Sequence, residues 1–243
     1  MTVPFTIIIP CRYASTRLPG KPLLEIKGKS LIQNVYEIAK SSDAKQIYIA
    51  TDDERISVAA KEFGAEVIMT STEHRSGTDR LAEVIEKEDI DDDEIIVNLQ
   101  GDEYALPVSL LNQVAKNLHH HPEMQVATLC ETIDEYDNYT DSNIVKVVFD
   151  KTNSALYFSR SPVPASRTNE IPENVYRHIG LYSYRAGYLK EFTRLPPCPI
   201  EISEALEQLR VLYYGGKIHV DIALEKTGIG IDTNDDLERA RTA

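Results

Sequence analysis

Short apolar runs alternate with amphipathic segments along the first hundred residues of the chain. Residues 5–9 form a largely apolar run closed by Pro10, which is typical of a strand buried in a parallel sheet. Residues 30–40 carry apolar side chains on one face of a helix. The same patterns predict strands at 46–50, 66–69 and 95–99 and helices at 53–63 and 78–87. This order, with its short connections, predicts an α/β fold with a doubly wound, mostly parallel sheet.

The second half of the chain changes character. Strand patterns at 126–130, 145–149, 155–159 and 179–184 follow one another with little helix between them. Residues 161–174 are rich in Pro, Ser and Asn, which predicts a mobile loop, and helices are expected at 203–213 and 235–241. We therefore expect one α/β domain over residues 1–243, with a smaller mixed lobe formed by approximately residues 126–223.

Charge and cysteine content narrow the functional classes. The chain of 243 residues has a formal net charge of −13, which argues against a nucleic-acid partner because phosphate backbones are bound by basic surfaces. Its three cysteines, an odd number without a Cys-x-x-Cys pair, indicate neither a disulfide framework nor a zinc site. No apolar stretch approaches the roughly 20 residues of a membrane helix, and no signal peptide is recognised. We expect a cytoplasmic protein without a membrane partner.

The loop after the first predicted strand is the first candidate site. In doubly wound sheets ligands bind beyond the carboxyl ends of the strands, and this loop carries Arg12, Arg17 and Lys21 within ten residues. Guanidinium forks and a compact ammonium suit the oxygens of a triphosphate, although a solvated basic turn would have the same composition. Residues 28–30 resemble the end of a P-loop, but its first glycine is absent because position 23 is Leu. Residues 228–230 lack the third glycine of a dinucleotide fingerprint.

Two aspartates follow apolar segments where a metal ligand could lie. Asp102 comes after the strand at 95–99 with Gly101 beside it, and Asp232 follows the short segment 228–231. Such carboxylates can share one Mg²⁺ that binds nucleotide phosphates. Asp102 as a turn residue and Asp232 as the cap of the final helix are equally compatible with the sequence.

Other polar residues have simpler interpretations. Asp52, between a strand and a helix, is interpreted as a helix cap. His119, His120 and His121 end a predicted helix, where successive side chains point in different directions, so a solvated cationic turn is favoured over a metal cluster. Cys11 adjoins Arg12 but has no neighbouring base, so it is not interpreted as a nucleophile.

Nine sequence blocks, in order and over nearly the whole chain, resemble the 3-deoxy-manno-octulosonate (Kdo) cytidylyltransferases. The blocks are RYASTRLPGKPL at 12–23, ATDD at 50–53, HRSGTDRLAE at 74–83, NLQGDE at 98–103, VKVV at 145–148, ALYFSR at 155–160, RHIGLY at 177–182, LEQLR at 206–210 and IDT at 231–233. The resemblance implies transfer of CMP from CTP to Kdo, with release of pyrophosphate, for lipopolysaccharide synthesis. It also implies a nucleotide-diphospho-sugar transferase-like fold, a homodimer, and sugar binding and dimerisation through the 126–223 lobe.

The resemblance also assigns roles to individual residues. Catalysis would use Arg12, Lys21, Asp102 and Asp232, and the two aspartates would hold Mg²⁺. The nucleotide would be bound by Arg12, Ser15, Arg17, Lys21, Ser76, Gly77, Arg80, Gln100 and Asp102. The sugar would be bound by Gln100, Arg160, His178, Tyr182, Tyr184, Glu207 and Gln208.

The chain departs from the family pattern at two places. Tyr104 stands where the family usually has a Pro, which would stiffen the backbone beside Asp102, so we expect a loop that is more mobile or differently shaped. The loop at 161–174 is shorter than in many members, which would alter the rim of the sugar site. Two alternatives therefore remain: the same reaction on the 8-amino analogue of Kdo, and a non-catalytic nucleotide-binding protein on this fold.

Overall fold

The computed structural model describes residues 3–14, 18–168, 170–228 and 230–242. The strands are β1 (Thr6–Cys11), β2 (Glu25–Ile26), β3 (Lys29–Ser30), β4 (Gln46–Thr51), β5 (Glu66–Met69), β6 (Ile95–Asn98), β7 (Val126–Thr132), β8 (Lys146–Phe149), β9 (Ala155–Ser159), β10 (Tyr176–Arg185) and β11 (Ile218–Ile222). The helices are η1 (Lys21–Leu23, a 3₁₀ turn), α1 (Leu31–Lys40), α2 (Glu54–Glu62), α3 (Gly77–Lys87), α4 (Val108–His120), α5 (Tyr136–Thr140), α6 (Ala186–Phe192), α7 (Pro199–Glu204), α8 (Gln208–Tyr213) and α9 (Asn234–Thr242).

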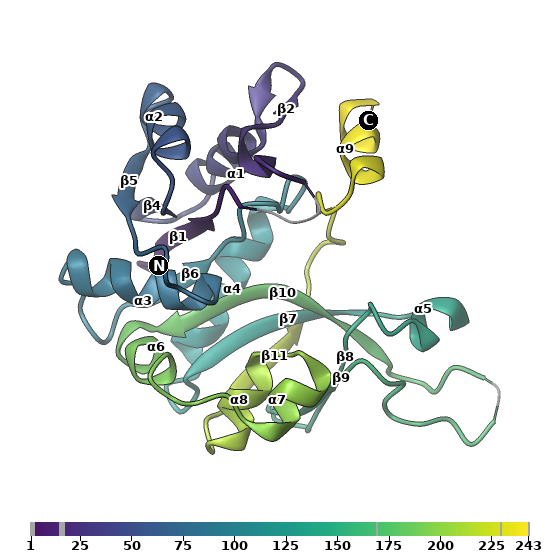
Figure 1. Ribbon diagram of the computed structural model, residues 1–243. Helices are drawn as coiled ribbons and strands as arrows, with labels where there is room; N and C mark the ends of the chain where they lie inside the picture. The colour runs from purple at the N-terminus through teal and green to yellow at the C-terminus, as the bar shows by residue number, and fades with distance from the viewer. Residues whose placement is uncertain (1–2, 15–17, 169, 229, 243) are drawn as a thin grey trace.

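One large sheet runs through the molecule, and β2 and β3 form a separate hairpin. The main strand order of the large sheet is β11-β7-β10-β6-β1-β4-β5, and β8 and β9 extend it from β10 (Figure 1). The strands β6, β1, β4 and β5 are parallel, whereas β10 is antiparallel to β6, β7 and β8. The expected doubly wound, mostly parallel sheet is therefore confirmed, and β10 is where the parallel half joins the mixed half.

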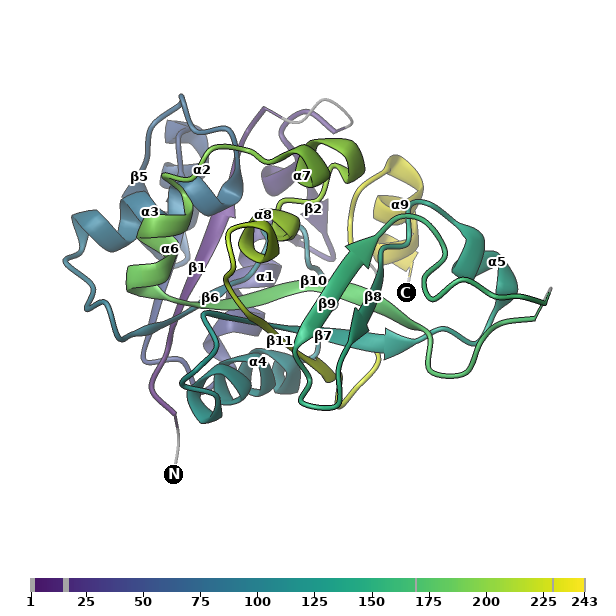
Figure 2. The same cartoon turned by 90° about the horizontal axis from the view of Figure 1, so that it is seen from below.

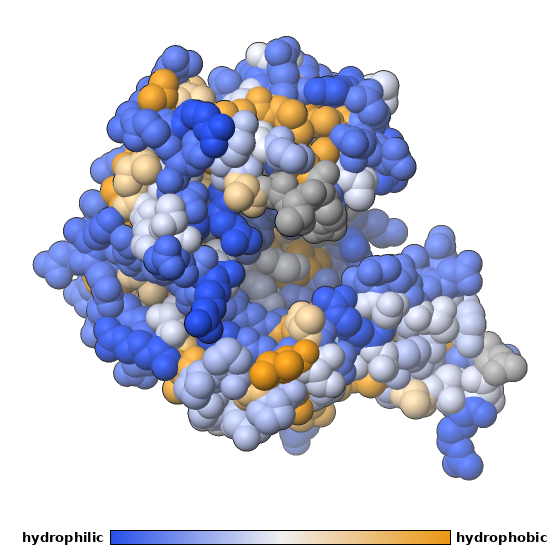
Figure 3. All heavy atoms as spheres, viewed as in Figure 1, coloured by the Kyte–Doolittle hydropathy of each residue, from blue (hydrophilic) through white to orange (hydrophobic). Residues whose placement is uncertain are grey.

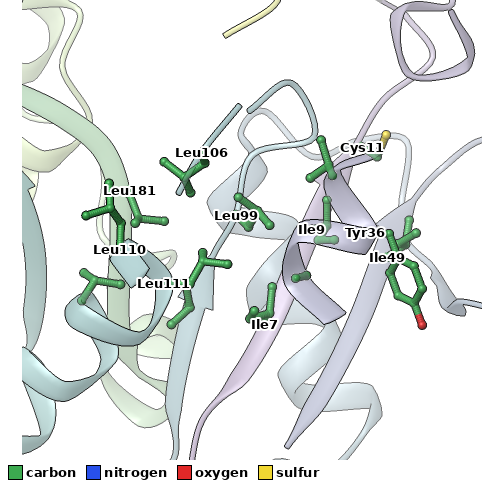
Figure 4. Close-up of a cluster of buried hydrophobic side chains, with 14 of the residues drawn as sticks. Ile7, Ile9, Cys11, Tyr36, Ile49, Leu99, Leu106, Leu110, Leu111 and Leu181 are labelled. Atoms are coloured by element: carbon green, nitrogen blue, oxygen red, sulfur yellow. The ribbon is translucent and has the colours of Figure 1, made fainter. Parts of the chain in front are cut away.

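Side chains of β1 alternate between two buried clusters, as the two-residue period of a strand requires. Ile7 and Ile9 pack with residues of α1, α2 and α4 on one face, part of which Figure 4 shows. Ile8 packs on the other face with residues of α3, α6 and α8. Both faces of the sheet are thus covered by helices, and the ends of the strands are left for ligands.

The helix expected at 203–213 is two helices, so that prediction is wrong. Ala205 adopts a left-handed conformation (φ 51°, ψ 49°) and ends α7 before α8 begins at Gln208. The side chain of Arg160 donates to the carbonyl oxygens of Glu204 (2.7 Å) and Ala205 (3.4 Å), which holds this break in place. Tertiary hydrogen bonds therefore override a sequence with good helix propensity. The strands β2, β3 and β11, the helices α5 and α6 and the first part of α7 were also not expected.

The loop at 161–174 has neither helix nor strand in its described residues, as expected. It is fastened to α5, because the Tyr139 hydroxyl donates to Pro164 O (2.7 Å) and accepts from the Ser166 amide (3.2 Å). Seen from below, α5 and the β8–β9 hairpin lie at one end of the molecule (Figure 2). None of the helices in the described ranges has the length and apolar character that a bilayer crossing requires.

Helix caps correct one interpretation of the sequence. Asp53, not Asp52, caps α2, since its carboxylate accepts from the amide of Arg55 (2.9 Å). Asp52 instead forms an ion pair with the fully buried Arg80. The apparent P-loop ending at residues 28–30 is the β2–β3 hairpin, whose turn residues Lys27 and Gly28 both have positive φ angles (52° and 80°).

Candidate active site

Lys21 reaches both predicted metal ligands. It follows Gly20, whose φ of 70° turns the chain after β1, and its amide donates to Leu18 O (3.0 Å). Its Nζ lies 2.7 Å from Asp102 Oδ2 and 3.1 Å from Asp232 Oδ1. The structure thus brings together Lys21, Asp102 and Asp232, and the Lys21 ammonium offsets the repulsion between the two carboxylates.

The loop that carries Asp102 is bound tightly to its surroundings. A Cβ at Gly101 would lie 3.1 Å from Pro10 O and 3.4 Å from Cys11 Sγ, so glycine permits the close approach of this loop to β1. Asp102 O accepts from the amides of Ile231 (3.0 Å) and Tyr104 (2.9 Å). The first of these bonds places the segment before Asp232 beside Asp102.

Tyr104 gives this loop a hydrogen bond that proline could not make. Proline has no amide hydrogen, so the 2.9 Å bond from Tyr104 N to Asp102 O depends on the departure from the family pattern. The Tyr104 side chain also packs against the larger core cluster. Hydrogen bonding and side-chain packing therefore restrain this loop, whereas a proline at position 104 would restrain it by fixing the backbone φ angle.

A cavity of about 390 Å³ opens at the carboxyl ends of β1 and β6. Its lining comprises Pro10, Cys11, Arg12, Ala14, Lys21, Pro22, Gly77, Arg80, Gln100, Gly101, Asp102 and Asp232. Figure 3 shows the molecule hollowed between the half that holds α1 and β2 and the lobe that holds α7 and α8. The expected nucleotide residues Arg12, Lys21, Gly77, Arg80, Gln100 and Asp102 meet here, whereas Ser15 and Arg17 lie outside the described residues.

Arg80 is a buried cation at the back of this cavity. Its guanidinium donates to Thr70 Oγ1 (2.6 Å) and Ser71 O (3.3 Å) and pairs with Asp52, while its Nε has no partner among the described residues. Ser76, also expected to frame the nucleotide, uses its hydroxyl to cap α3 by accepting from the Asp79 amide (3.2 Å). This cap fixes the start of α3 at Gly77.

A second, smaller cavity of about 90 Å³ holds most of the expected sugar residues. It is lined by Thr78, Asn98, Gln100, Val126, Tyr182, Tyr184, Phe192, Glu207, Gln208 and Val211. Gln100 also lines the larger cavity, so the two spaces adjoin at one side chain. Thr78 Oγ1 donates to Glu207 Oε2 (2.6 Å), and burial raises the pKa of the Glu207 carboxyl. Burial also raises the pKa of the Tyr182 and Tyr184 phenols, which therefore remain neutral donors.

Two expected sugar residues lie outside both cavity linings in the described structure. Burial lowers the pKa of His178 to about 3, and its Nε2 lies 3.0 Å from Thr128 Oγ1. Its ring packs against Phe158 and Tyr182, so it supports Tyr182 from behind. Arg160 donates to Glu204 O (2.7 Å) and Ser142 O (3.0 Å), which places its guanidinium at the α7–α8 junction.

Asn98 and Thr78 were not singled out from the sequence, although both line the smaller cavity. A signal for Asn98 was present: it is a polar residue that ends the apolar run of β6, at the edge where ligands of such sheets bind. Thr78 carries no comparable signal, because only its position opposite Glu207 gives it a role.

The carboxylate pair fits one divalent cation. One carboxylate oxygen of Asp102 and one of Asp232 lie within 3.1 Å of the Lys21 ammonium, so the two carboxylates face the same cationic group. In the described residues no group of three or more His, Cys, Asp or Glu side chains gathers as a metal site, the three consecutive histidines included. Mg²⁺ commonly uses one or two carboxylates together with phosphate oxygens and water, which suits this pair.

Two further ionisable groups adjoin the pair. Burial, reinforced by Asp102 and Asp232, raises the pKa of Glu103 to about 7. Burial raises the pKa of the Cys11 thiol well above its ordinary value, which disfavours the thiolate that a nucleophile requires.

The fold and this cation–carboxylate cavity define a nucleotidyltransferase, an enzyme, and comparison with known proteins agrees. The sequence model of the cytidylyltransferases matches residues 6–220. The chain belongs to this family, and within it to the 3-deoxy-manno-octulosonate cytidylyltransferases. It is 50% identical to the member from Hahella chejuensis over 98% of this chain and 96% of that protein, and 51% identical to 3-deoxy-manno-octulosonate cytidylyltransferase 2 of Actinobacillus pleuropneumoniae serotype 5b over 98% and 97%.

A solved structure supports the same conclusion. A CMP:2-keto-3-deoxy-manno-octonic acid synthetase complexed with CTP superposes with a TM-score of 0.92 at 41% identity, covering 98% of this chain and 97% of that one.

Proposed function

We propose that this enzyme transfers CMP from CTP to the anomeric hydroxyl of Kdo, giving CMP-Kdo and pyrophosphate for lipopolysaccharide synthesis. The observation that carries the proposal is the contact of Lys21 with Asp102 and Asp232 at the mouth of a cavity that also holds Arg12 and Gln100. A triphosphate needs such cations, and its divalent metal needs such carboxylates.

The larger cavity takes the nucleotide in this proposal. Arg12, exposed at the end of β1, and Lys21 bind phosphate oxygens, with Ser15 and Arg17 from the same loop. Gly77 leaves room beside Pro10, since a Cβ there would lie 3.2 Å from its ring. Ser76 and Arg80 fix this wall of the cavity and frame the cytosine and ribose, the first by capping α3 and the second through its pair with Asp52.

The smaller cavity takes part of the sugar. Glu207 accepts hydrogen bonds from sugar hydroxyls, Tyr182 and Tyr184 provide neutral phenols, and Gln100 and Gln208 provide amides. His178 acts by supporting Tyr182, and Arg160 faces the sugar carboxylate from the α7–α8 junction. We extend this role to the mixed lobe at approximately 126–223, which would also form the interface of a homodimer.

The reaction joins these two spaces. The anomeric hydroxyl loses its proton to water as its oxygen attacks the α-phosphorus in line, the bond from that phosphorus to the bridging oxygen breaks, and pyrophosphate leaves with the electron pair. Arg12 and Lys21 stabilise the charge that develops on the phosphate oxygens. Asp102 and Asp232 would hold Mg²⁺, whose chemistry there is to neutralise phosphate charge and to lower the pKa of a bound hydroxyl. The enzyme would work in the cytoplasm, without a nucleic-acid or membrane partner.

The test is pyrophosphate release from CTP and Mg²⁺ with Kdo, its 8-amino analogue or sialic acid in parallel. Release with Kdo that EDTA and Asp102→Ala both abolish is the expected result. Release with the 8-amino analogue alone would move the proposal to that sugar and leave the mechanism unchanged. If CTP binds and none of the sugars reacts, the catalytic proposal is wrong and a nucleotide-binding role replaces it.

A further inference from the structure

One buried polar atom at the end of β6 lacks a partner. The side chain of Asn98 is only 2% exposed, and its Oδ1 has no hydrogen-bond partner among the residues that the structure describes. A buried amide oxygen without a partner costs free energy, so proteins seldom retain one that serves nothing. Exchanging the amide oxygen and nitrogen would leave an unpaired N–H at the same place, so the need for a partner does not depend on how the amide is oriented.

This atom belongs to the lining of the 90 Å³ cavity. Asn98 shares that cavity with Gln100 and Glu207, and it pairs across the sheet with Tyr182, another lining residue. Val126, Phe192 and Val211 give the same cavity an apolar wall. A liquid-like water occupies roughly 30 Å³, so the space admits a hydroxyl-bearing carbon of a sugar and excludes a whole nucleotide or an eight-carbon acid.

The polar groups of the cavity point to a polyol. Glu207, at the start of α8, and Asn98, at the end of β6, each offer an oxygen acceptor to the cavity. Glu207 Oε2 already accepts from Thr78 (2.6 Å), which fixes the carboxylate in place. A sugar carboxylate would meet these acceptors unfavourably, whereas a hydroxyl can donate to one of them and accept from a tyrosine.

We propose that Asn98 is a further sugar-contacting residue, whose side-chain amide hydrogen-bonds a hydroxyl group of the acidic sugar in the smaller cavity. The inference rests on the proposed sugar transfer and adds to it a residue and a place for one hydroxyl. Asn98 lies two residues before Gln100, which lines both cavities. The end of β6 would therefore hydrogen-bond the sugar on the side of the smaller cavity that adjoins the nucleotide cavity.

The first test is Asn98→Leu, which keeps the size of the side chain and removes its polar atoms. We expect the KM for the sugar to rise about tenfold, as for a neutral hydrogen bond whose partner is left unpaired. The Kd for CTP without sugar, measured by calorimetry, should change by less than about twofold, since Asn98 does not line the nucleotide cavity. If the leucine variant does not fold, Asn98→Ala is measured instead, with the same expectation, since it also removes the amide.

Ser183→Ala is the matched control. Ser183 is fully buried on β10 beside the β6 residue Val97, and it donates to Val114 O (2.8 Å) on the α4 side, away from the smaller cavity. Its loss should lower the melting temperature and leave the sugar KM unchanged. An equal rise of the sugar KM in both variants would attribute the Asn98 effect to lost stability and overturn the inference.

Deoxy sugars identify the hydroxyl. With the wild-type enzyme, each sugar that lacks one hydroxyl bound in the cavity should have a higher KM than the parent sugar. With Asn98→Leu, the sugar that lacks the hydroxyl bound by Asn98 should have the same KM as the parent sugar. If the sugar KM of Asn98→Leu equals that of the wild type, Asn98 holds only water and the inference is wrong, although the transfer reaction stands. If the wild-type enzyme itself transfers CMP to no sugar, the proposed function fails and this inference fails with it.

Discussion

Lys21 Nζ lies 2.7 Å from Asp102 Oδ2 and 3.1 Å from Asp232 Oδ1, so a single ammonium joins two carboxylates from distant parts of the chain. The contact with Asp232 spans 211 residues of sequence. The Lys21 side chain is only 12% exposed, whereas the side chains of Asp102 and Asp232 are 38% and 53% exposed, so the ammonium is fixed while both carboxylates remain open to solvent. Phosphates that enter the cavity therefore meet a cation that is already positioned.

Lys21→Met should abolish most turnover. Removing one preorganised positive group from a developing phosphate charge typically lowers turnover by about 10²- to 10³-fold, and the two carboxylates would also be left without their cation. Pyrophosphate release at saturating CTP and sugar measures the loss. Lys29→Met is the control, since Lys29 pairs with Glu37 on the exposed surface and its loss should leave the rate unchanged.

Asp102→Asn and Asp232→Asn should each raise the Mg²⁺ concentration needed for half-maximal activity by about tenfold or more, because each removes one anionic ligand. In the double variant, the rise in the Mg²⁺ requirement should be smaller than the product of the two single rises, since both carboxylates would bind one ion. Asp150→Asn gives the comparison: Asp150 accepts from the amide of Thr152 (2.8 Å) in the turn between β8 and β9, away from the carboxylate pair, so it should alter stability alone. Equal Mg²⁺ requirements in all variants would contradict the carboxylate assignment.

Asp52 and Asp53 are neighbours with different tasks. Asp52→Asn leaves the buried Arg80 without its ion pair and should lower the free energy of unfolding by about 3 kcal/mol, with weaker CTP binding. Asp53→Ala removes the cap of α2 and should cost about 1 kcal/mol, with CTP binding unchanged. Chemical denaturation and CTP calorimetry separate the two; weaker CTP binding in Asp53→Ala would argue against this division.

His178 should make the stability of the protein depend on pH. Its pKa of about 3 in the folded state lies below the ordinary value of 6.5, so between these values the unfolded chain binds the extra proton. Acidification from pH 6.5 should thus lower the stability of the wild type relative to His178→Gln, by up to about 1.4 kcal/mol per pH unit. Denaturant titrations at several pH values measure the difference. An equal change of stability with pH in the wild type and in His178→Gln would contradict this expectation.

The order of elements in the first half follows from local pattern. Strand β5 was expected at its observed residues, and α1 and α3 within one residue, because apolar periodicity and caps such as Ser30 lie close together in sequence. The break at Ala205 could not be found this way. It depends on hydrogen bonds from Arg160, which is distant in sequence, to carbonyl groups that a continuous helix would use itself.

The residues of the site divide in the same way into those that local sequence indicates and those that only the folded structure reveals. Position after an apolar segment made Lys21, Asp102 and Asp232 candidates, the family resemblance assigned their roles, and the structure brings all three together. The role of Asp52 was assigned wrongly. Its position just before α2 suggested a helix cap, and no neighbouring residue in the sequence indicates that it pairs with the buried Arg80. Roles that rest on shape, such as those of Thr78 and Asn98, emerge only when the cavity is known.

The bond from Ile231 N to Asp102 O has a consequence for the order in which the enzyme is made. Strands β1 to β11 are complete once residue 222 has been synthesised, but the segment that carries Asp232 follows them. A growing chain can therefore assemble its sheet, its core and its basic loop before it holds the second carboxylate. The contact between Lys21 and Asp232 can form only later, when the segment that carries Asp232 closes over the loop made far earlier.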